Sequence, residues 1–128
     1  MDAGKLAGLR ILVVEDDLSS KLYLNTILGK AGAIVLNASD GIEAVRSIEE
    51  NKDIDIVLMD IQLPSMDGYT ATKKIRESGN RVKIIAQTAY GLASDLEVIQ
   101  SGGFDDYLIK PIYSEQLLSM IIKVRDGS

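Results

Sequence analysis

Short runs of apolar residues alternate with helix-like patterns five times along the chain, and this alternation restricts the folds that it can adopt. The apolar runs are rich in branched side chains and cover residues 9–14, 33–38, 54–59, 82–86 and 107–109. Short, nearly continuous runs of this kind are typical of strands that are buried on both faces. Because strand–helix–strand crossovers are right-handed, five such units predict a parallel five-stranded sheet with helices on both faces, an α/β fold.

The segments between the apolar runs carry helical spacing and helix-start signals. Asp17, Asp40 and Ser114 are each placed to cap the N-terminus of a helix. Asp40 is followed three residues later by Glu43, which resembles a capping box. Two further helices are predicted at about 68–78 and 93–101.

The length and composition of the chain suit one domain. It has 128 residues, of which 46% are hydrophobic, and a net charge of -5. We expect the domain to span 9–126, with a flexible N-terminal segment at 1–8 and a tail at 127–128. The acidic charge predicts no direct nucleic acid binding, and no apolar run reaches the roughly 18 residues that membrane insertion requires.

The chain contains neither cysteine nor histidine, and this excludes several kinds of chemistry. A thiolate nucleophile, an imidazole base and a thiolate or imidazole metal ligand are all excluded. Any bound metal must therefore be held by oxygen atoms, and any nucleophile must be a hydroxyl, an amine or a carboxylate.

Polar side chains follow the predicted strands at the points where they end. They are Glu15, Asp16 and Asp17 after the first strand, Asp60 after the third, Gln87 and Thr88 after the fourth and Lys110 after the fifth. Ligands of open parallel sheets bind at this carboxyl edge. Two carboxylates about 4 Å apart repel by about 4 kcal/mol at an effective dielectric near 20. A shared proton or a divalent cation, Mg²⁺ or Mn²⁺, would relieve that repulsion.

Carboxylates that hold a cation beside a lysine and a hydroxyl suit phosphoryl transfer, with Asp60 as the nucleophile. Each residue alone also has a simpler interpretation. Asp17 is better explained as a helix cap, Asp60 as a turn residue, and Thr88 and Lys110 as an ordinary strand end and a solvated lysine. Their predicted position at one edge of the sheet favours the functional interpretation.

Four motifs resemble the receiver domain of bacterial-type two-component response regulators, and the resemblance extends from Arg10 to Val124. The motifs are ILVVEDD at 11–17, LMDIQLPSMDG at 58–68, TA at 88–89 and DYLIKP at 106–111. The resemblance implies a doubly wound, flavodoxin-like (βα)5 fold with strand order 2-1-3-4-5.

The resemblance also implies roles for the acidic residues. Asp60 corresponds to the phosphoacceptor. Asp16 and Asp60 correspond to direct Mg²⁺ ligands, together with the backbone carbonyl of Gln62. Glu15 stands where many receivers have Asp, and its longer side chain would reach the metal through water.

The remaining matches concern switching. Lys110 corresponds to the lysine that pairs with the acyl phosphate, and its bond to Pro111 is expected to be cis. Thr88 corresponds to the switch hydroxyl and Tyr107 to the switch aromatic, although Tyr107 is also compatible with a plain core or rim position. Two positions that influence phosphate lifetime in the family correspond to Gln62 and Tyr90.

The implied function is primarily that of a phosphoacceptor switch rather than a turnover enzyme, with autocatalytic phosphorylation of the aspartate followed by dephosphorylation. Asp60 would take a phosphoryl group from a phosphohistidine on a histidine kinase or a histidine phosphotransfer domain. Because the chain has no histidine, the donor must be another domain or a small acyl phosphate. We expect a cytoplasmic location, on the cytoplasmic side of the membrane if a parent kinase is membrane-anchored.

The surroundings of the domain are also expectations. Ser20, Tyr23 and Leu24 resemble the family's docking face, and ordinary helix packing explains each of them equally well. Dimerisation would use the helix at 93–101, the fifth strand and the last helix. The chain ends without an effector domain, so it is a stand-alone regulator or an excised receiver of a hybrid kinase, which Glu15 favours.

Three other classes compete with this interpretation. A haloacid dehalogenase-type phosphatase needs an acid/base Asp two residues after the nucleophile, where this chain has Gln62. A flavodoxin-like cofactor module needs a phosphate loop after the first strand, where Glu15 and its acidic neighbours would repel phosphate. A pseudo-receiver scaffold would not need the reactive residues that are present here.

Overall fold

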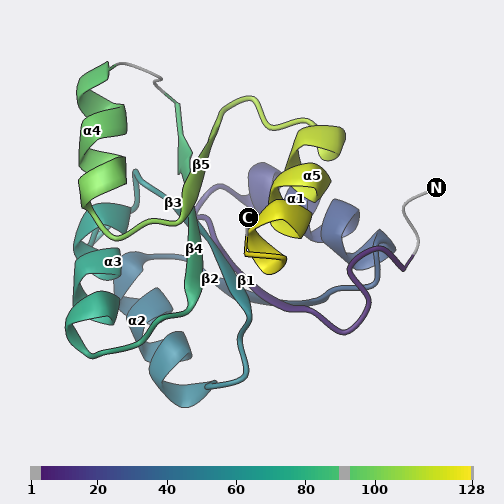
Figure 1. Ribbon diagram of the computed structural model, residues 1–128, viewed down its shortest axis with the longest axis horizontal. Coiled ribbons are helices and arrows are strands. Elements are labelled where there is room, and N and C mark those ends of the chain that lie inside the picture. Colours follow the sequence, from purple (N-terminus) through teal and green to yellow (C-terminus); the bar gives the residue numbers. More distant parts are fainter. Residues whose placement is uncertain (1–3, 90–92, 128) are drawn as a thin grey trace.

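The computed structural model describes residues 4–89 and 93–127, with side chains in the fourth helix described from residue 96 onward. Strands and helices alternate along the chain, as the sequence predicts (Figure 1). Their bounds are β1 Arg10–Val14, α1 Leu18–Lys30, β2 Ile34–Ala38, α2 Gly41–Glu50, β3 Ile56–Asp60, α3 Gly68–Glu77, β4 Lys83–Thr88, α4 Ala93–Ser101, β5 Asp106–Ile109 and α5 Ser114–Arg125.

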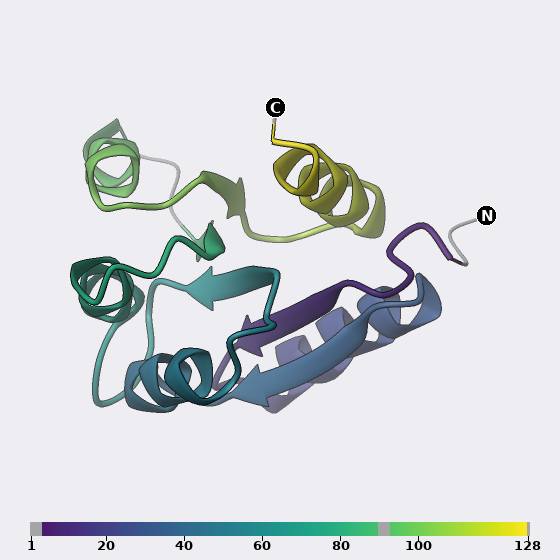
Figure 2. The same cartoon turned by 60° about the horizontal axis from the view of Figure 1, so that its bottom comes forward.

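The strands form one parallel sheet in the order β2-β1-β3-β4-β5, which confirms the predicted fold and strand order. Helices α1 and α5 lie on one side of the sheet, and α2, α3 and α4 lie on the other (Figures 1 and 2). The central strands are therefore covered on both faces, which explains why their sequences are continuously apolar.

Side chains of alternate strand residues enter two separate cores. Ile11 and Leu58 pack toward α1 and α5, against residues such as Leu28 and Leu117. Strand residues of the other parity pack toward α2 and α3, and they include Leu12, Val14, Val57 and Met59. Because successive side chains of a strand point to opposite faces of the sheet, each apolar strand contributes side chains to both helical layers.

Two of the three predicted helix caps are confirmed. The Asp17 side chain accepts a hydrogen bond from the Ser20 N–H at 2.8 Å, and Asp40 accepts one from the Glu43 N–H at 2.8 Å. The Glu43 carboxylate in turn accepts from the Ser39 N–H at 3.3 Å, so it ties down the chain ahead of α2.

The predicted cap at Ser114 is wrong. Tyr113 is the N-cap of α5 and makes no capping side-chain hydrogen bond. The Leu117 N–H donates to the Tyr113 carbonyl at 3.0 Å, so the helix begins with Ser114 already inside it. The buried positions of Ile112 and Leu117 set this boundary in place of the cap preference.

The third and fourth strands extend further toward their carboxyl ends than their apolar runs indicate. The apolar runs predict β3 at 54–59 and β4 at 82–86, whereas the strands span Ile56–Asp60 and Lys83–Thr88. Asp60 pairs with Gln87, and Thr88 pairs with Ile109. These polar residues belong to the strands because their backbones pair with neighbouring strands, and a search for apolar runs does not predict that pairing.

The packed unit begins before residue 9. Leu6 is fully buried in the α1–α5 core, and its N–H donates to the Ala31 carbonyl at 2.8 Å. The segment 1–8, for which we expect flexibility, thus includes a core residue. A turn places Leu6 against the C-terminal end of α1, where this hydrogen bond forms. Over 4–89 and 93–127, no helix has both the length and the apolar content that a bilayer span needs.

Candidate functional site

The carboxyl edge of the sheet brings together residues from four segments of the chain. Asp60 ends β3, Thr88 ends β4, and Glu15 directly follows β1. The Ile61 N–H donates to the Gln87 carbonyl at 3.0 Å, and the Lys110 N–H donates to the Thr88 carbonyl at 2.8 Å. These backbone bonds fix the residues after β3 and β5 against the end of β4.

An ion pair between Asp60 and Lys110 lies at the centre of this edge. The Lys110 Nζ is 2.8 Å from Asp60 Oδ2 and 3.6 Å from Glu15 Oε2. Asp60 is only 3% exposed, and its Oδ1 accepts the Gln62 N–H at 3.1 Å. The carboxylate is thus held on both oxygens and oriented by its neighbours.

Glu15 adds a second buried carboxyl group beside Asp60. It is 1% exposed, and its Oε1 accepts the Asp17 N–H at 3.1 Å. Its Oε2 is buried without a hydrogen-bond partner within the described part of the chain. One carboxylate oxygen from each of Glu15, Asp16 and Asp60 lies within 4.8 Å of the others.

The electrostatics of the edge follow from this crowding. Burial raises the pKa of Glu15 to about 7, and hydrogen bonding and charge repulsion from Asp60 act in the same direction. Burial by itself would lower the pKa of Lys110, but its hydrogen bond to Asp60 and the charges of Asp60 and Glu15 raise it above its ordinary value. Lys110 therefore stays charged, and the site keeps more carboxylates than it can neutralise.

This excess of carboxylates fits a divalent cation. Glu15, Asp16 and Asp60 bring three carboxylates against the single ammonium of Lys110. The orphaned Glu15 oxygen is an acceptor that lacks a donor, and the donor set is all oxygen. Mg²⁺ and other hard cations prefer such ligands.

The other predicted site residues lie around this centre. Asp16, Gln62 and Thr88 line a hollow of about 570 Å³ on the same edge. Asp16 and Gln62 are exposed, whereas Thr88 is 5% exposed. The structure thus brings together Glu15, Asp16, Asp60, Gln62, Thr88 and Lys110.

Tyr107 is half-buried on β5 and packs against the cluster formed by Ile61, Ala86 and Ile99. The Lys110–Pro111 peptide bond is cis, as the resemblance implies. Tyr90 lies outside the described residues, so its predicted role remains an expectation.

Sequence reasoning gave no role to two residues at this edge. Gln87 is 1% exposed and lines a cavity together with Glu15 and Lys110. At Gly68, a Cβ atom would collide with the backbone carbonyl of Asp60. The Gly68 position could have been suspected, because a glycine starts a helix here after a Pro-containing loop. For Gln87 the sequence shows only a polar residue at the end of an apolar run, with no signal that its side chain is buried.

Comparison with known proteins shows the family to which the chain belongs. The sequence model of the response regulator receiver domain matches residues 11–122. The chain is 36% identical over 119 residues to the sensor histidine kinase GacS of Pseudomonas protegens, which covers 89% of this chain but 13% of that kinase. It is 35% identical over 120 residues to the two-component response regulator ORR41 of Oryza sativa subsp. japonica, which covers 91% of this chain and 94% of that protein.

Solved structures show the same fold. The receiver domain of the sensor histidine kinase PA1611 from Pseudomonas aeruginosa is 43% identical, with a TM-score of 0.84 over 95% of this chain and 100% of that one. That structure has a magnesium ion coordinated in its active-site cleft. The chain spans about an eighth of the GacS kinase and nearly all of ORR41. This chain belongs to the response regulator receiver domain family of two-component signal transduction.

Proposed function

We propose that Asp60 accepts a phosphoryl group and that Lys110 assists the transfer. The observation that carries this proposal is the buried Asp60 carboxylate, held 2.8 Å from the Lys110 ammonium beside a second acidic group. A carboxylate fixed on a strand end is a nucleophile whose geometry is set before the donor arrives.

The transfer is a single displacement at phosphorus, in which Asp60 replaces the imidazole of the donor. An Asp60 oxygen attacks phosphorus and forms a P–O bond, while the P–N bond of the donor phosphohistidine breaks. The imidazole leaves with that electron pair and takes a proton from solvent. Lys110 exchanges its hydrogen bond to Asp60 for one to a phosphoryl oxygen, which offsets the charge that develops there.

Asp16, Asp60 and the Gln62 backbone carbonyl are the groups that would hold Mg²⁺, with Glu15 contributing through water. Mn²⁺ has similar ligand preferences and would bind the same oxygens. When bound, the cation supplies positive charge to the phosphoryl oxygens. Without it, the carboxylates of this chain would repel an incoming phosphate.

Thr88 and Tyr107 are proposed to transmit the phosphorylation. The Thr88 hydroxyl, at the buried end of β4, would bond the new phosphoryl group and move toward it. Tyr107, half-buried on the neighbouring strand, would then turn into the space that Thr88 leaves. This would shift an existing equilibrium in the surface formed by α4, β5 and α5.

The proposed partner is a histidine kinase or a histidine phosphotransfer domain in the cytoplasm. The likeness to kinase-linked receivers supports this choice, and the lack of histidine means that this chain needs an external donor. β5 is an edge strand with Ile109 43% exposed, which supports dimerisation through that face.

The proposal is tested by incubating the protein with acetyl phosphate and Mg²⁺ and measuring its intact mass. We expect a single phosphoryl adduct that is absent in Asp60→Asn and unchanged in Asp126→Asn, a matched change at an exposed aspartate. If no adduct forms with acetyl phosphate, a phosphorylated kinase domain is used as the donor. An adduct that survives in Asp60→Asn, or none with either donor, would contradict the proposal.

The metal assignment is tested separately. Asp16→Ala should abolish Mg²⁺ binding in a calorimetric titration, because it removes an exposed direct ligand. Asp53→Ala, an exposed aspartate before β3, serves as the control. Equal Mg²⁺ affinity in Asp16→Ala and the wild type would refute the ligand set.

A further inference from the structure

A cavity of about 340 Å³ lies behind the Lys110–Asp60 pair, between α1 and the segment that joins β5 to α5. Glu15, Lys110 and Gln87 line its polar part, and Tyr23 and Ile112 belong to its apolar part. The Tyr23 hydroxyl donates to the Ile112 carbonyl at 2.8 Å and joins the two sides of this cavity.

Gln87 is the unexplained residue of this cavity. Its side chain is almost completely buried, yet neither the amide nitrogen nor the amide oxygen has a hydrogen-bond partner among the residues that the structure describes. A buried amide left unsatisfied costs roughly 1–3 kcal/mol. An apolar side chain would pack at this position without that cost, so the presence of an amide indicates that it has a hydrogen-bonding role.

The groups around Gln87 complement its amide. Glu15 Oε2 is a buried acceptor without a hydrogen-bond donor, and the Gln87 NH₂ group offers donors. Lys110 has three N–H donors, and one of them donates to Asp60, while Glu15 Oε2 at 3.6 Å is an ionic neighbour beyond hydrogen-bond distance. The Gln87 carbonyl offers an acceptor for another of these donors.

The ladder places Gln87 where it can act on Lys110. Gln87 is the direct partner of Asp60 between β3 and β4, and it is next to Leu108 between β4 and β5. Gln87 therefore stands on the strand between the one that carries the nucleophile and the one that leads to Lys110, and it lines the same cavity as Glu15 and Lys110.

We propose that Gln87 is a positioning residue that bridges Glu15 and Lys110, directly or through one water molecule, and thereby holds the Lys110 ammonium in place during phosphoryl transfer. This rests on the proposed function of Asp60. As Lys110 passes from Asp60 to a phosphoryl oxygen, the Gln87 carbonyl remains a fixed acceptor beside it. The amide NH₂ group keeps the Glu15 carboxylate from drawing the ammonium away.

The test compares Gln87→Met with the wild type, because methionine keeps the shape of glutamine and removes the amide. Loss of a hydrogen bond to a charged group should lower the maximal rate of phosphorylation by acetyl phosphate about tenfold. The half-saturating donor concentration should not change, and the urea midpoint should not fall. Gln100→Met, at an exposed position of α4, is the matched control and should match the wild type in all three.

A second measurement separates action through Lys110 from a general structural effect. In a Lys110→Met background, Gln87→Met should cause no further loss of rate, because the bridge has already lost one end. A high-resolution crystal structure should place the Gln87 carbonyl within hydrogen-bond distance of Lys110, or of a water molecule that also contacts Lys110.

The outcomes distinguish this inference from the proposed function. If the wild type forms no adduct, the function of Asp60 is wrong. If the wild type is phosphorylated and Gln87→Met reacts at the same rate, the positioning role is overturned. A crystal structure in which the Gln87 amide contacts neither Lys110 nor a shared water overturns it as well, whatever the rates.

Discussion

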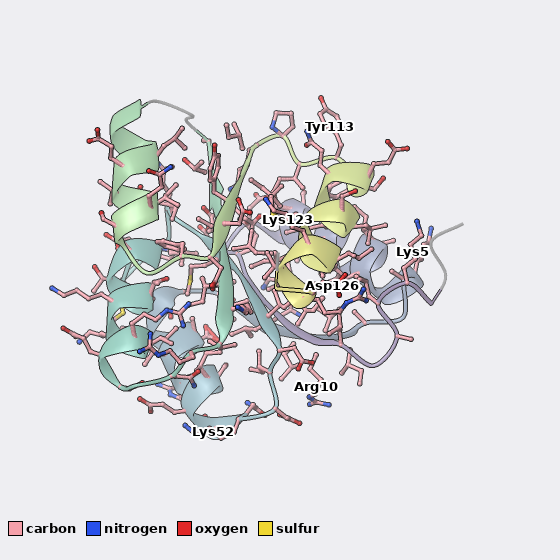
Figure 3. All side chains as sticks on the ribbon, viewed as in Figure 1. Lys5, Arg10, Lys52, Tyr113, Lys123 and Asp126 are labelled. Atoms are coloured by element: carbon pink, nitrogen blue, oxygen red, sulfur yellow. The ribbon has the colours of Figure 1, made fainter. Side chains whose placement is uncertain are left out.

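The two edges of the sheet carry two differently built ion-pair networks. At the amino ends of the strands, the Arg76 guanidinium donates to the carbonyls of Gly103, Asn80 and Val82 at 2.7–3.0 Å and to Asp105 Oδ2 at 3.0 Å. At the carboxyl ends, Lys110 pairs with two of three clustered carboxylates, and one of these two has a buried oxygen without a hydrogen-bond donor. Arg10, at the start of β1, and Tyr113, beyond the end of β5, mark these opposite ends of the molecule in Figure 3.

The two networks differ in whether their charges and hydrogen bonds are balanced, and this difference indicates a structural role for one and a binding role for the other. In the amino-edge network, formed by Arg76, Asp105 and their backbone partners, Arg76 donates four hydrogen bonds, and Asp105 also accepts the Ile84 N–H at 2.8 Å. This network joins the end of α3 to the loops before β4 and β5. The carboxyl-edge network of Glu15, Asp16, Asp60 and Lys110 has excess negative charge and an oxygen without a hydrogen-bond donor, so a bound cation lowers its free energy.

The largest expected effect is at the amino edge. Arg76→Met keeps the aliphatic part of the side chain but removes the guanidinium, so three carbonyls and Asp105 lose their donor. We expect the free energy of unfolding to fall by about 3 kcal/mol, measured by urea denaturation. Lys74→Met, at an exposed position of the same helix, should stay within about 0.5 kcal/mol of the wild type. Equal effects of the two changes would contradict a structural role for Arg76.

The carboxyl edge should instead show a pH dependence. The pKa of Glu15 is about 7 in the folded protein, whereas its ordinary value is 4.5. Between these two pH values the folded state therefore binds more protons than the unfolded state. The stabilisation from neutral Glu15 is complete below the ordinary value and is lost as the pH rises through about 7. Without divalent cations, urea denaturation should show a loss of about 2 kcal/mol between about pH 5 and pH 8. The same slope in Glu15→Gln would exclude Glu15 as its source.

Neutralising one aspartate should have opposite consequences at the two edges. Asp60→Asn removes a carboxylate that repels Glu15, so the metal-free protein should gain about 1 kcal/mol of stability at about pH 8. Asp105→Asn removes the charge that pairs with Arg76 and should destabilise the protein. Thermal unfolding of the two variants under the same conditions checks both signs. A loss of stability in Asp60→Asn would show that the carboxyl edge is not strained.

The smallest expected effect separates charge from hydrogen bonding at the amino edge. The Lys83 Nζ is 3.9 Å from Asp105 Oδ1, and its side chain is 46% exposed. Such exposed pairs contribute about 0–1 kcal/mol, so Lys83→Ala should change the urea midpoint only slightly. A loss close to that of Arg76→Met would mean that net charge, and not the bonds of Arg76, holds this edge.

Much of the fold and of the site could be predicted from the sequence. The apolar runs predicted a parallel sheet, and the rule that parallel strands end at one edge placed Asp60, Glu15 and Lys110 together. The strand ends were less predictable, because Gln87 and Thr88 belong to β4 through ladder pairing and not through an apolar pattern. The Ser114 cap was wrong because packing around Leu117 set the start of α5.

What the sequence determined by itself is the set of local periods and the residue types at the strand ends. Both depend only on side-chain chemistry and on the geometry of residues that are close together in the sequence. Only the tertiary structure decided that Arg76 donates four hydrogen bonds while Glu15 keeps an oxygen without a donor, and that Gln87 lies buried in the cavity that Lys110 also lines. These properties depend on backbone carbonyls and buried volumes contributed by distant segments, and packing alone brings those segments together.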